Sequence, residues 1–560
     1  MDTVLLVLIL LLIASATGVA ARFMPSLPTP LVQIGFGALL AWPTTGLHVE
    51  LEPEIFLLLF IAPLLFADAR RFPQREFMVL RGPILALALG LVLFTVVGVG
   101  YFINWLLPAL PLPVCFALAA ILSPTDAVAV SAISGRLPVP ARLMRILEGE
   151  SLMNDASGLV AFKFAVAAAL TGAFSLADAA LGFFIISVGG LAVGAVLAVV
   201  FNIVRTRLIE RHLGEASTIQ IVLLLLLLPF AAYLLAEHFG MSGILAAVAA
   251  GMVINRTDLK RQDQINTRMQ ERSVWEMLEF VLNALVFLLL GFQLPDIIKG
   301  ALDHSLHEVG DYEFLRLLGY VAVISLSLLA LRFIWIVAAV NVSRLLARNR
   351  NTVRGASMRV VLAATLSGIR GTITLAAALS LPQLMNDGTP FPARELLIFL
   401  ATGVIMFTLI TGSIGLPLLL RNLDIPKDTH EFEEERQARI KGAEAAIRRI
   451  ESYHQQRASD IAQHAHAEAL IVAFNDSSTQ LMNYYRQRLQ LGNDDTPAPQ
   501  LAALRQLERD TRLEALRAER REYYKLRGKH RINDDVLRKL VREVDLVETA
   551  LTGGASTSHH

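Results

Sequence analysis

Apolar residues occur in long runs over the first 424 positions of the chain, and polar residues crowd the remainder. An α-helix rises about 1.5 Å per residue, so roughly 20 apolar residues cross the hydrocarbon core of a bilayer. Runs near this length recur up to residue 424. They predict an all-α polytopic membrane protein with about thirteen spans, at 3–20, 30–46, 54–68, 83–106, 113–134, 143–170, 180–204, 217–236, 240–254, 274–292, 318–343, 358–382 and 395–420.

Basic residues in the loops predict the orientation of these spans. With the polar C-terminal segment in the cytoplasm, thirteen spans place the N-terminus outside, and alternate loops face the cytoplasm. The cytoplasmic set then carries 21 Lys and Arg residues, against three in the opposite set. This is the positive-inside signal of a multi-pass protein of the cell inner (plasma) membrane. The cytoplasmic set comprises 21–29, 69–82, 135–145, 205–216, 255–273 and 344–359.

The overall composition indicates two solvents for the two parts of the chain. Of the 560 residues, 18% are charged and 54% are hydrophobic, whereas a soluble chain carries about 25% charged residues. The deficit lies in the apolar part. We therefore expect a transmembrane domain at 1–424, a helical cytoplasmic tail at 425–552 and a disordered end at 553–560.

The polar tail is typical of a solvated helical bundle. Residues 431–466 and 500–525 are rich in helix formers, and 533–551 carries apolar residues at helical spacing. The single Cys115 excludes an intramolecular disulfide and a paired-cysteine metal site. The chain has no phosphate-binding loop, zinc-ligand spacing or dinucleotide fingerprint. Neither a cofactor nor a nucleic-acid partner is therefore expected.

Few ionisable residues lie inside the predicted spans, and each is a candidate for function. A charged side chain at mid-membrane costs at least ~2.5–3.5 kcal/mol. Asp126 lies in the fifth span, Asp155 in the sixth and Arg370 in the twelfth, and Asp68 ends the third. Further charges within these spans include Glu148, Glu150, Lys163, Glu276, Glu279 and Arg332.

Helical spacing places oxygen ligands together on the sixth span. Ser151 and Asp155 are four residues apart and share a face, while Glu150 and Asn154 form an adjacent row. A carboxylate beside a hydroxyl suits a hard cation. The sixth span is therefore the first candidate for an ion site.

Two spans contain residues that interrupt a helix. Pro124 removes a backbone donor within the fifth span, and Gly368 and Gly371 bracket Arg370 in the twelfth. If spans 1–6 and 8–13 are two inverted repeats, each interruption falls in the fifth helix of its repeat. Paired interruptions at matching positions point to the substrate site of a transporter.

These segments resemble the monovalent cation:proton antiporter family, which includes bacterial sodium/proton antiporters and animal sodium/hydrogen exchangers. The match runs from about Asp68 to Leu420. It is carried by five motifs in order: Pro63-Leu64-Leu65-Phe66-Ala67-Asp68, Ser123-Pro124-Thr125-Asp126-Ala127-Val128-Ala129-Val130, Glu150-Ser151-Leu152-Met153-Asn154-Asp155-Ala156, Met241-Ser242-Gly243-Ile244 and Gly368-Ile369-Arg370-Gly371.

The resemblance implies two crossing unwound helices inside a mobile core domain, beside a separate dimerisation domain, and hence a homodimer. It also implies that Asp155 binds the cation or the proton. Asn154, in place of a second aspartate, goes with electroneutral exchange. Asn283 falls where animal members carry a glutamate, which leaves its role open.

We therefore predict a secondary antiporter, not an enzyme, that exchanges Na⁺ for H⁺ in pH and cation homeostasis, with K⁺ and Li⁺ as alternatives. Ionised Asp155 binds the cation with help from Asp126, and protonation releases it. Glu150 and Arg370 are expected to form a structural ion pair. The expected ligands of the transported metal ion are Asp155, Thr125 and Ser151; Asn154 belongs to the same site and Asp68 is an accessory residue.

Plainer roles remain open for several of these residues. Asp126 can cap a half-helix, and the long stem of Lys163 can carry its charge to the membrane surface. Arg332, Glu276 and Glu279 are interpreted as rim or packing charges. The small residues Gly189, Gly190 and Gly194 form a close-packing surface that is a candidate contact for a second subunit.

Two other classes of function are weighed against antiport. Asp126 and Asp155 would be the pair of an intramembrane aspartyl protease, but the Tyr-Asp and Gly-x-Gly-Asp signatures of that class are absent. A cation channel would need a filter-like loop, which the sequence does not contain.

Overall fold

The computed structural model describes residues 2–23, 27–41, 53–134, 139–171, 176–210, 218–258, 265–305, 313–346, 357–386, 388–421, 429–461, 467–493, 498–529 and 531–552. The chain forms two compact units, Met1–Asp424 and Ile425–His560. The expected disordered end, 553–560, lies outside the described residues.

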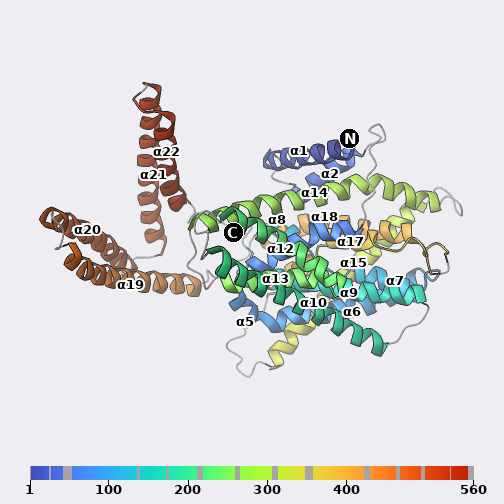
Figure 1. The fold of residues 1–560 in the computed structure, drawn as a ribbon. Helices are drawn as coiled ribbons and strands as arrows, with labels where there is room; N and C mark the ends of the chain where they lie inside the picture. Colours follow the sequence, from blue (N-terminus) through green and yellow to red (C-terminus); the bar gives the residue numbers. More distant parts are fainter. Residues whose placement is uncertain are drawn as a thin grey trace. The chain divides into compact units, whose positions relative to one another are not determined.

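Helices build the first unit (Figure 1), and a helix or a pair of half-helices covers the core of each expected span. The first half contains α1 (Asp2–Phe23), α2 (Thr29–Leu40), α3 (Pro53–Phe56), η1 (Leu57–Ile61), α4 (Ala62–Arg71), α5 (Gln74–Leu85), η2 (Ala86–Leu91), α6 (Val92–Leu106), α7 (Leu112–Ile121), α8 (Ala127–Ser134) and α9 (Ala141–Thr171). The second half contains α10 (Leu176–Val204), η3 (Arg205–Glu210), α12 (Thr218–His238), α13 (Gly243–Asp258), α14 (Ile265–Ser305), α15 (Glu313–Leu346), α16 (Met358–Leu366), α17 (Thr372–Leu379) and α18 (Arg394–Leu420).

The outer surfaces of these helices are apolar. Seven of the described helices are long and apolar enough to cross a membrane, and four shorter apolar helices accompany them. Leu12, Trp105 and Ile219 expose 70%, 73% and 74% of their surface. Lipid can cover such side chains, whereas water would penalise them. The prediction of an all-helical protein with multiple apolar spans is confirmed.

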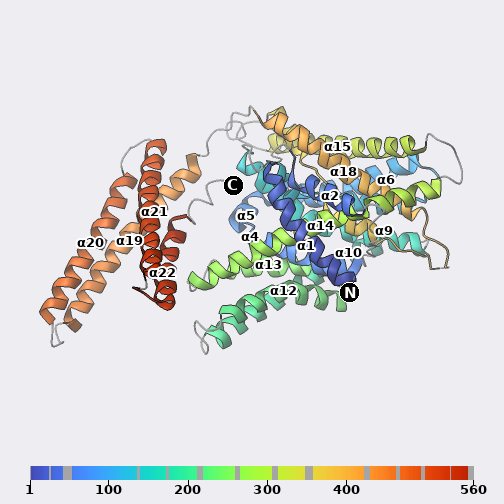
Figure 2. The ribbon, with the colours of Figure 1, turned by 90° about the horizontal axis from the view of Figure 1, so that it is seen from above.

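Two helices are interrupted at mid-length, as the sequence predicts. The fifth span divides into α7 and α8, and the twelfth into α16 and α17. The two breaks meet: the Asp126 N–H donates to the Ile369 carbonyl over 2.7 Å, and Arg370 Nε donates to the Leu122 carbonyl over 2.9 Å. Long α14 runs along the upper side of the bundle in Figure 1, and the view from above shows it crossing between α12 and α15 (Figure 2).

Two π-helical turns, η1 and η2, lie inside the third and fourth spans. Such turns often mark functional positions because they shift the backbone pattern by one residue. Turn η1 leads directly into α4, which carries Asp68. In η2, the Ala88 carbonyl accepts a hydrogen bond of 2.7 Å from Ser157 Oγ on α9. The turns therefore lie beside the helices that carry the candidate site.

The glycine surface on α10 packs within the chain. A Cβ atom at Gly194 would overlap the Ala246 backbone of α13, and Gly189 contacts Met241 just before that helix. Close packing is therefore confirmed. Its partner is α13 of the same chain, which corrects the idea that these glycines face a second subunit.

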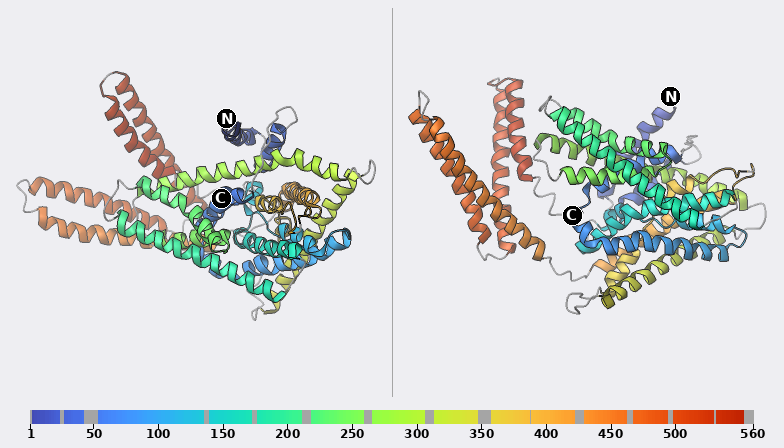
Figure 3. Two further views of the ribbon diagram at one scale, coloured as in Figure 1. Left: turned by 45° about the vertical axis from the view of Figure 1, so that its right-hand side comes forward. Right: turned by 60° about the horizontal axis from the view of Figure 1, so that its bottom comes forward.

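The second unit consists of two helical hairpins (Figure 3), in which α19 packs on α20 and α21 packs on α22. The His454 ring stacks on Phe474 with centroids 5.0 Å apart, and His454 Nε2 lies 2.6 Å from Asn475 Oδ1. Helix α20 was not anticipated, because its run 475–479 contains only Asn, Asp, Ser and Thr. The bounds are α19 (Thr429–Ile461), α20 (Ala467–Asn493), α21 (Ala498–Gly528) and α22 (Asp534–Thr552).

Candidate functional site

A cavity of about 40 Å³ lies beside the two helix breaks. This volume exceeds the ~10–15 Å³ that one water molecule needs, so a small cation or water fits. Helices α4, α9, α14 and α17 contribute to its wall, together with the break before α8. Its polar and glycine lining consists of Asp68, Thr125, Asp126, Ser151, Asp155, Asn283, Gly371, Thr372 and Thr374. Five predicted site residues therefore share one cavity.

Asp155 presents its carboxylate to this cavity from the middle of α9. The residue is only 4% exposed. Within the described residues, no backbone or side-chain group donates a hydrogen bond to this carboxylate. The negative charges of Asp126, Asp68 and Glu150 act on it from nearby. A buried carboxylate without donors requires either a proton or a cation.

Asp126 is committed to the backbone instead. Its Oδ1 atom accepts hydrogen bonds from the N–H groups of Val128, at 2.8 Å, and Ala129, at 3.0 Å. The same carboxylate lies against Gly371, directly before α17, and the backbone of Thr372 acts favourably on it. One negative charge therefore lies at the N-termini of both inner half-helices, where the helix dipoles favour it.

Gly371 permits this close approach of α17 to Asp126. A Cβ atom at position 371 would overlap the Asp126 carboxylate. Glycine therefore fits here for lack of a side chain, rather than for an unusual backbone angle.

A chain of hydrogen bonds fixes the polar residues behind the cavity. Asn154 Nδ2 donates to Thr125 Oγ1 over 2.8 Å, and Thr125 Oγ1 donates to Glu150 Oε1 over 3.4 Å. Ser151 Oγ accepts from the Ala127 N–H over 3.3 Å, which ties α9 to the start of α8. Asn154 thus holds Thr125 in place, and its own side chain does not line the cavity.

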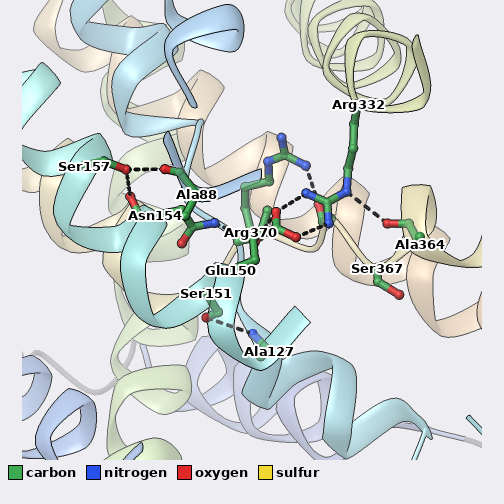
Figure 4. Close-up of polar contacts among 12 residues, drawn as sticks. Ala88, Ala127, Glu150, Ser151, Asn154, Ser157, Arg332, Ala364, Ser367 and Arg370 are labelled. Atoms are coloured by element: carbon green, nitrogen blue, oxygen red, sulfur yellow. Dashed lines mark hydrogen bonds and ion pairs between the residues drawn. The ribbon is translucent and has the colours of Figure 1, made fainter. Parts of the chain in front are cut away.

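Glu150 pairs with Arg332 of α15, and not with Arg370 as predicted (Figure 4). Arg332 Nη2 donates to Glu150 Oε2 over 2.8 Å, and Nη1 contacts Oε1. Arg332 Nε also donates to the Ala364 carbonyl over 3.0 Å. The side chains of Glu150 and Arg332 are 1% and 2% exposed. Of the two roles expected for Arg332, the rim charge is wrong and the packing charge agrees with the structure, because this guanidinium is buried and bidentate.

Arg370 satisfies carbonyl groups at the ends of the outer half-helices. Its guanidinium donates to Leu122, which follows α7, and to Gly368, which follows α16. Its backbone N–H donates to Thr408 Oγ1 over 3.2 Å. The last carbonyls of a helix lack intrahelical partners and carry partial negative charge. Arg370 thus compensates two C-termini, as Asp126 compensates two N-termini.

The sequence of the first unit matches that of a known protein family. Residues 7–422 match the family model described as "Sodium/hydrogen exchanger, transmembrane". The chain belongs to the sodium/hydrogen exchanger family. It is therefore a multi-pass membrane transporter that exchanges a monovalent cation for protons, and it is not an enzyme. This result sets aside the aspartyl protease and the channel.

Individual relatives of this exchanger support the assignment. It is 44% identical to the uncharacterized Na⁺/H⁺ exchanger YjcE of Escherichia coli, over 98% of this chain and 99% of that protein. It is 47% identical to a sodium, potassium, lithium and rubidium/H⁺ antiporter of Bacillus subtilis, over 75% of this chain and 62% of that protein. The structure of the sodium proton antiporter MjNhaP1 of Methanocaldococcus jannaschii at pH 8 has a similar fold, with a TM-score of 0.56. The two chains are 19% identical, and the match covers 76% of this chain and all of MjNhaP1.

Three other charges that the sequence places in the spans, Lys163, Glu276 and Glu279, do not line the cavity. Lys163 contacts Glu237 at 3.3 Å and is 54% exposed, so it forms a surface pair. Glu279 pairs with Arg71 over 2.5 Å. Glu276 pairs with Arg272 one helical turn away. Asp68 and Asn283 are different, because both line the cavity, from α4 and α14.

Two threonines of the cavity wall were missed in the sequence, and Arg332 was noted without its partner. A charge within a predicted span needs a buried partner, and that requirement could have pointed from Arg332 to Glu150. Thr372 and Thr374 line the cavity from α17, and Thr374 is 1% exposed. No sequence signal separates it from other threonines that bond their own helix.

Proposed function

We propose that this exchanger carries one proton against one monovalent cation, Na⁺ foremost, and that the Asp155 carboxylate binds the two ions in turn. The observation that carries the proposal is the state of the carboxylates in and behind the cavity. Asp126 is held by backbone N–H groups and Glu150 by Arg332. The Asp155 carboxylate has no protein donor among the described residues and faces a cavity large enough for an ion.

Competition at one carboxylate couples the two fluxes. Ionised Asp155 attracts the cation, with Ser151 and Thr125 as neutral oxygen ligands and Asp126 adding negative potential. A proton on Asp155 removes that attraction and releases the cation. Backbone N–H groups hold Asp126 and Arg332 holds Glu150, so we assign ion exchange to Asp155 and to neither of these carboxylates. One exchanging group then gives an electroneutral exchange.

Asp68 has an accessory role in this scheme. It lines the same cavity from α4, opposite α9, and no donor within the described residues engages its carboxylate. We assign it to attracting and guiding the cation toward Asp155.

The architecture supports alternating access around this site. We propose thirteen spans, with spans 1–6 and 8–13 as inverted repeats, and a core domain that contains both interrupted helices and rocks against the remaining helices. The basic loops support an external N-terminus and a cytoplasmic tail in the inner (plasma) membrane. A homodimer is also proposed, on the resemblance to the family alone.

Cation preference is tested by adding each cation in turn to proteoliposomes that contain the purified protein and a pH-sensitive dye. The Bacillus subtilis relative is named for sodium, potassium, lithium and rubidium, which supports a site that accepts more than Na⁺. We expect proton flux with Na⁺ and weaker flux with Li⁺ and K⁺. A response to K⁺ alone would replace the proposal with a K⁺/H⁺ antiporter.

The role of Asp155 is tested by Asp155→Asn. The matched control is Glu148→Gln, the same change on the same helix at a residue that pairs with Arg145 near the surface. We expect Asp155→Asn to insert and fold but to lose exchange, while Glu148→Gln keeps it. Cation-driven proton flux in purified Asp155→Asn would contradict the proposed site.

A further inference from the structure

Thr374 carries a buried hydroxyl group that the fold leaves without a partner. The residue is 1% exposed. Its Oγ1 atom has no hydrogen-bond partner within the described residues. Most buried hydroxyl groups are satisfied, and helical threonines commonly bond a carbonyl of the preceding turn. Thr365 and Thr408 do so here, at 2.9 Å each. The hydroxyl of Thr374 therefore requires another explanation.

The position of Thr374 supplies one. It lines the same cavity as Asp155, from the first turn of α17. Three other polar residues of that wall already make hydrogen bonds: Asp126 with the backbone, Thr125 with Asn154 and Glu150, and Ser151 with Ala127. Thr374 is thus a residue of the cavity wall whose hydroxyl group is uncommitted.

A second buried threonine with an unpartnered hydroxyl group lies outside the cavity wall and is a matched control. Thr402 of α18 is 2% exposed, and its Oγ1 also lacks a partner within the described residues. Thr402 is not part of the cavity wall. The two residues therefore share chemistry and burial, and they differ in access to the cavity.

We infer that Thr374 is a further cation-binding residue, whose hydroxyl oxygen is a neutral ligand for the monovalent cation held by Asp155. This inference rests on the proposed function of the Asp155 site. Alkali cations are bound by hard oxygen ligands, and a hydroxyl completes the coordination shell without adding charge. It raises affinity for the cation while leaving Asp155 as the group that exchanges the proton.

The test compares Thr374→Val, Thr374→Ser and Thr402→Val in proteoliposomes, with proton flux measured over a series of Na⁺ concentrations. Valine keeps the shape and removes the hydroxyl. We expect Thr374→Val to raise the apparent KM for Na⁺ roughly three- to tenfold, the effect of one lost ligand or hydrogen bond, with the maximal rate nearly unchanged. Thr374→Ser and Thr402→Val should keep the wild-type KM.

A second measurement covers folding. Replacing an unpartnered buried hydroxyl should not destabilise the protein, so the Tm in detergent without Na⁺ should not fall. The rise in Tm caused by Na⁺ should shift to higher Na⁺ concentrations in Thr374→Val only. If the valine variant does not fold, Thr374→Ala carries the same comparison. An unchanged KM in the folded variant, or an equal rise in Thr402→Val, would overturn the inference. Wild-type exchange and an inactive Asp155→Asn would still stand, which separates this failure from failure of the proposed function.

Discussion

Replacing Arg332 by methionine keeps much of the side-chain volume and removes the charge that neutralises Glu150. Both partners are at most 2% exposed, and Arg332 contacts both oxygens of the carboxylate and the Ala364 carbonyl. Without it, Glu150 keeps only the Thr125 hydroxyl, at 3.4 Å, among the hydrogen bonds described above. Leaving one member of a buried pair unpaired costs about 3–5 kcal/mol. We therefore expect Arg332→Met to lower the Tm in detergent by several degrees and to reduce transport.

Two further variants test the reasoning. Arg71→Met removes a charge that is 51% exposed and pairs with Glu279, so it should cost less than about 1 kcal/mol. The double variant Glu150→Met/Arg332→Met removes both buried charges and should be more stable than either single variant. Equal losses for Arg332→Met and Arg71→Met, or a double variant weaker than both singles, would refute this account of the pair.

Two other changes address the helix breaks. Gly371→Ala should abolish exchange, because the new methyl group occupies the place of the Asp126 carboxylate; proton flux in proteoliposomes measures this, and Gly82→Ala, with open space around it, is the control. Arg370→Ala should lower both the Tm and transport, because it leaves the Leu122 and Gly368 carbonyls without their donor; an unchanged Tm with lost transport would make Arg370 a direct participant.

The sequence predicted what is local along the chain. Run length located the helices, and Pro124 and Gly371 marked the interruptions. Helical spacing placed Ser151 and Asp155 on one face, and both line the cavity. These inferences needed only the geometry of one helix and the cost of irregular backbone in lipid.

Contacts between helices far apart in the chain were harder to predict from the sequence. Glu150 and Arg332 are 182 residues apart, and periodicity cannot say which face of α15 turns toward α9. The sequence pattern favoured Arg370 as the partner of Glu150, but the Arg370 guanidinium donates to carbonyl groups at the helix breaks. The alternative role of Asp126 as a helix cap is confirmed. It could be predicted from the sequence because a cap depends on residues only two and three positions away.

The most direct test of the central claim is proton flux in proteoliposomes that are clamped at different membrane potentials. With Asp155 as the single exchanging group, one proton moves for one cation. The rate and the reversal point should then be independent of voltage and follow only the two ion gradients, and Asp155→Asn should show no flux. A rate or reversal point that shifts with voltage would show that net charge moves in each cycle, and a second titrating carboxylate, Asp68 or Asp126, would have to share the work of Asp155.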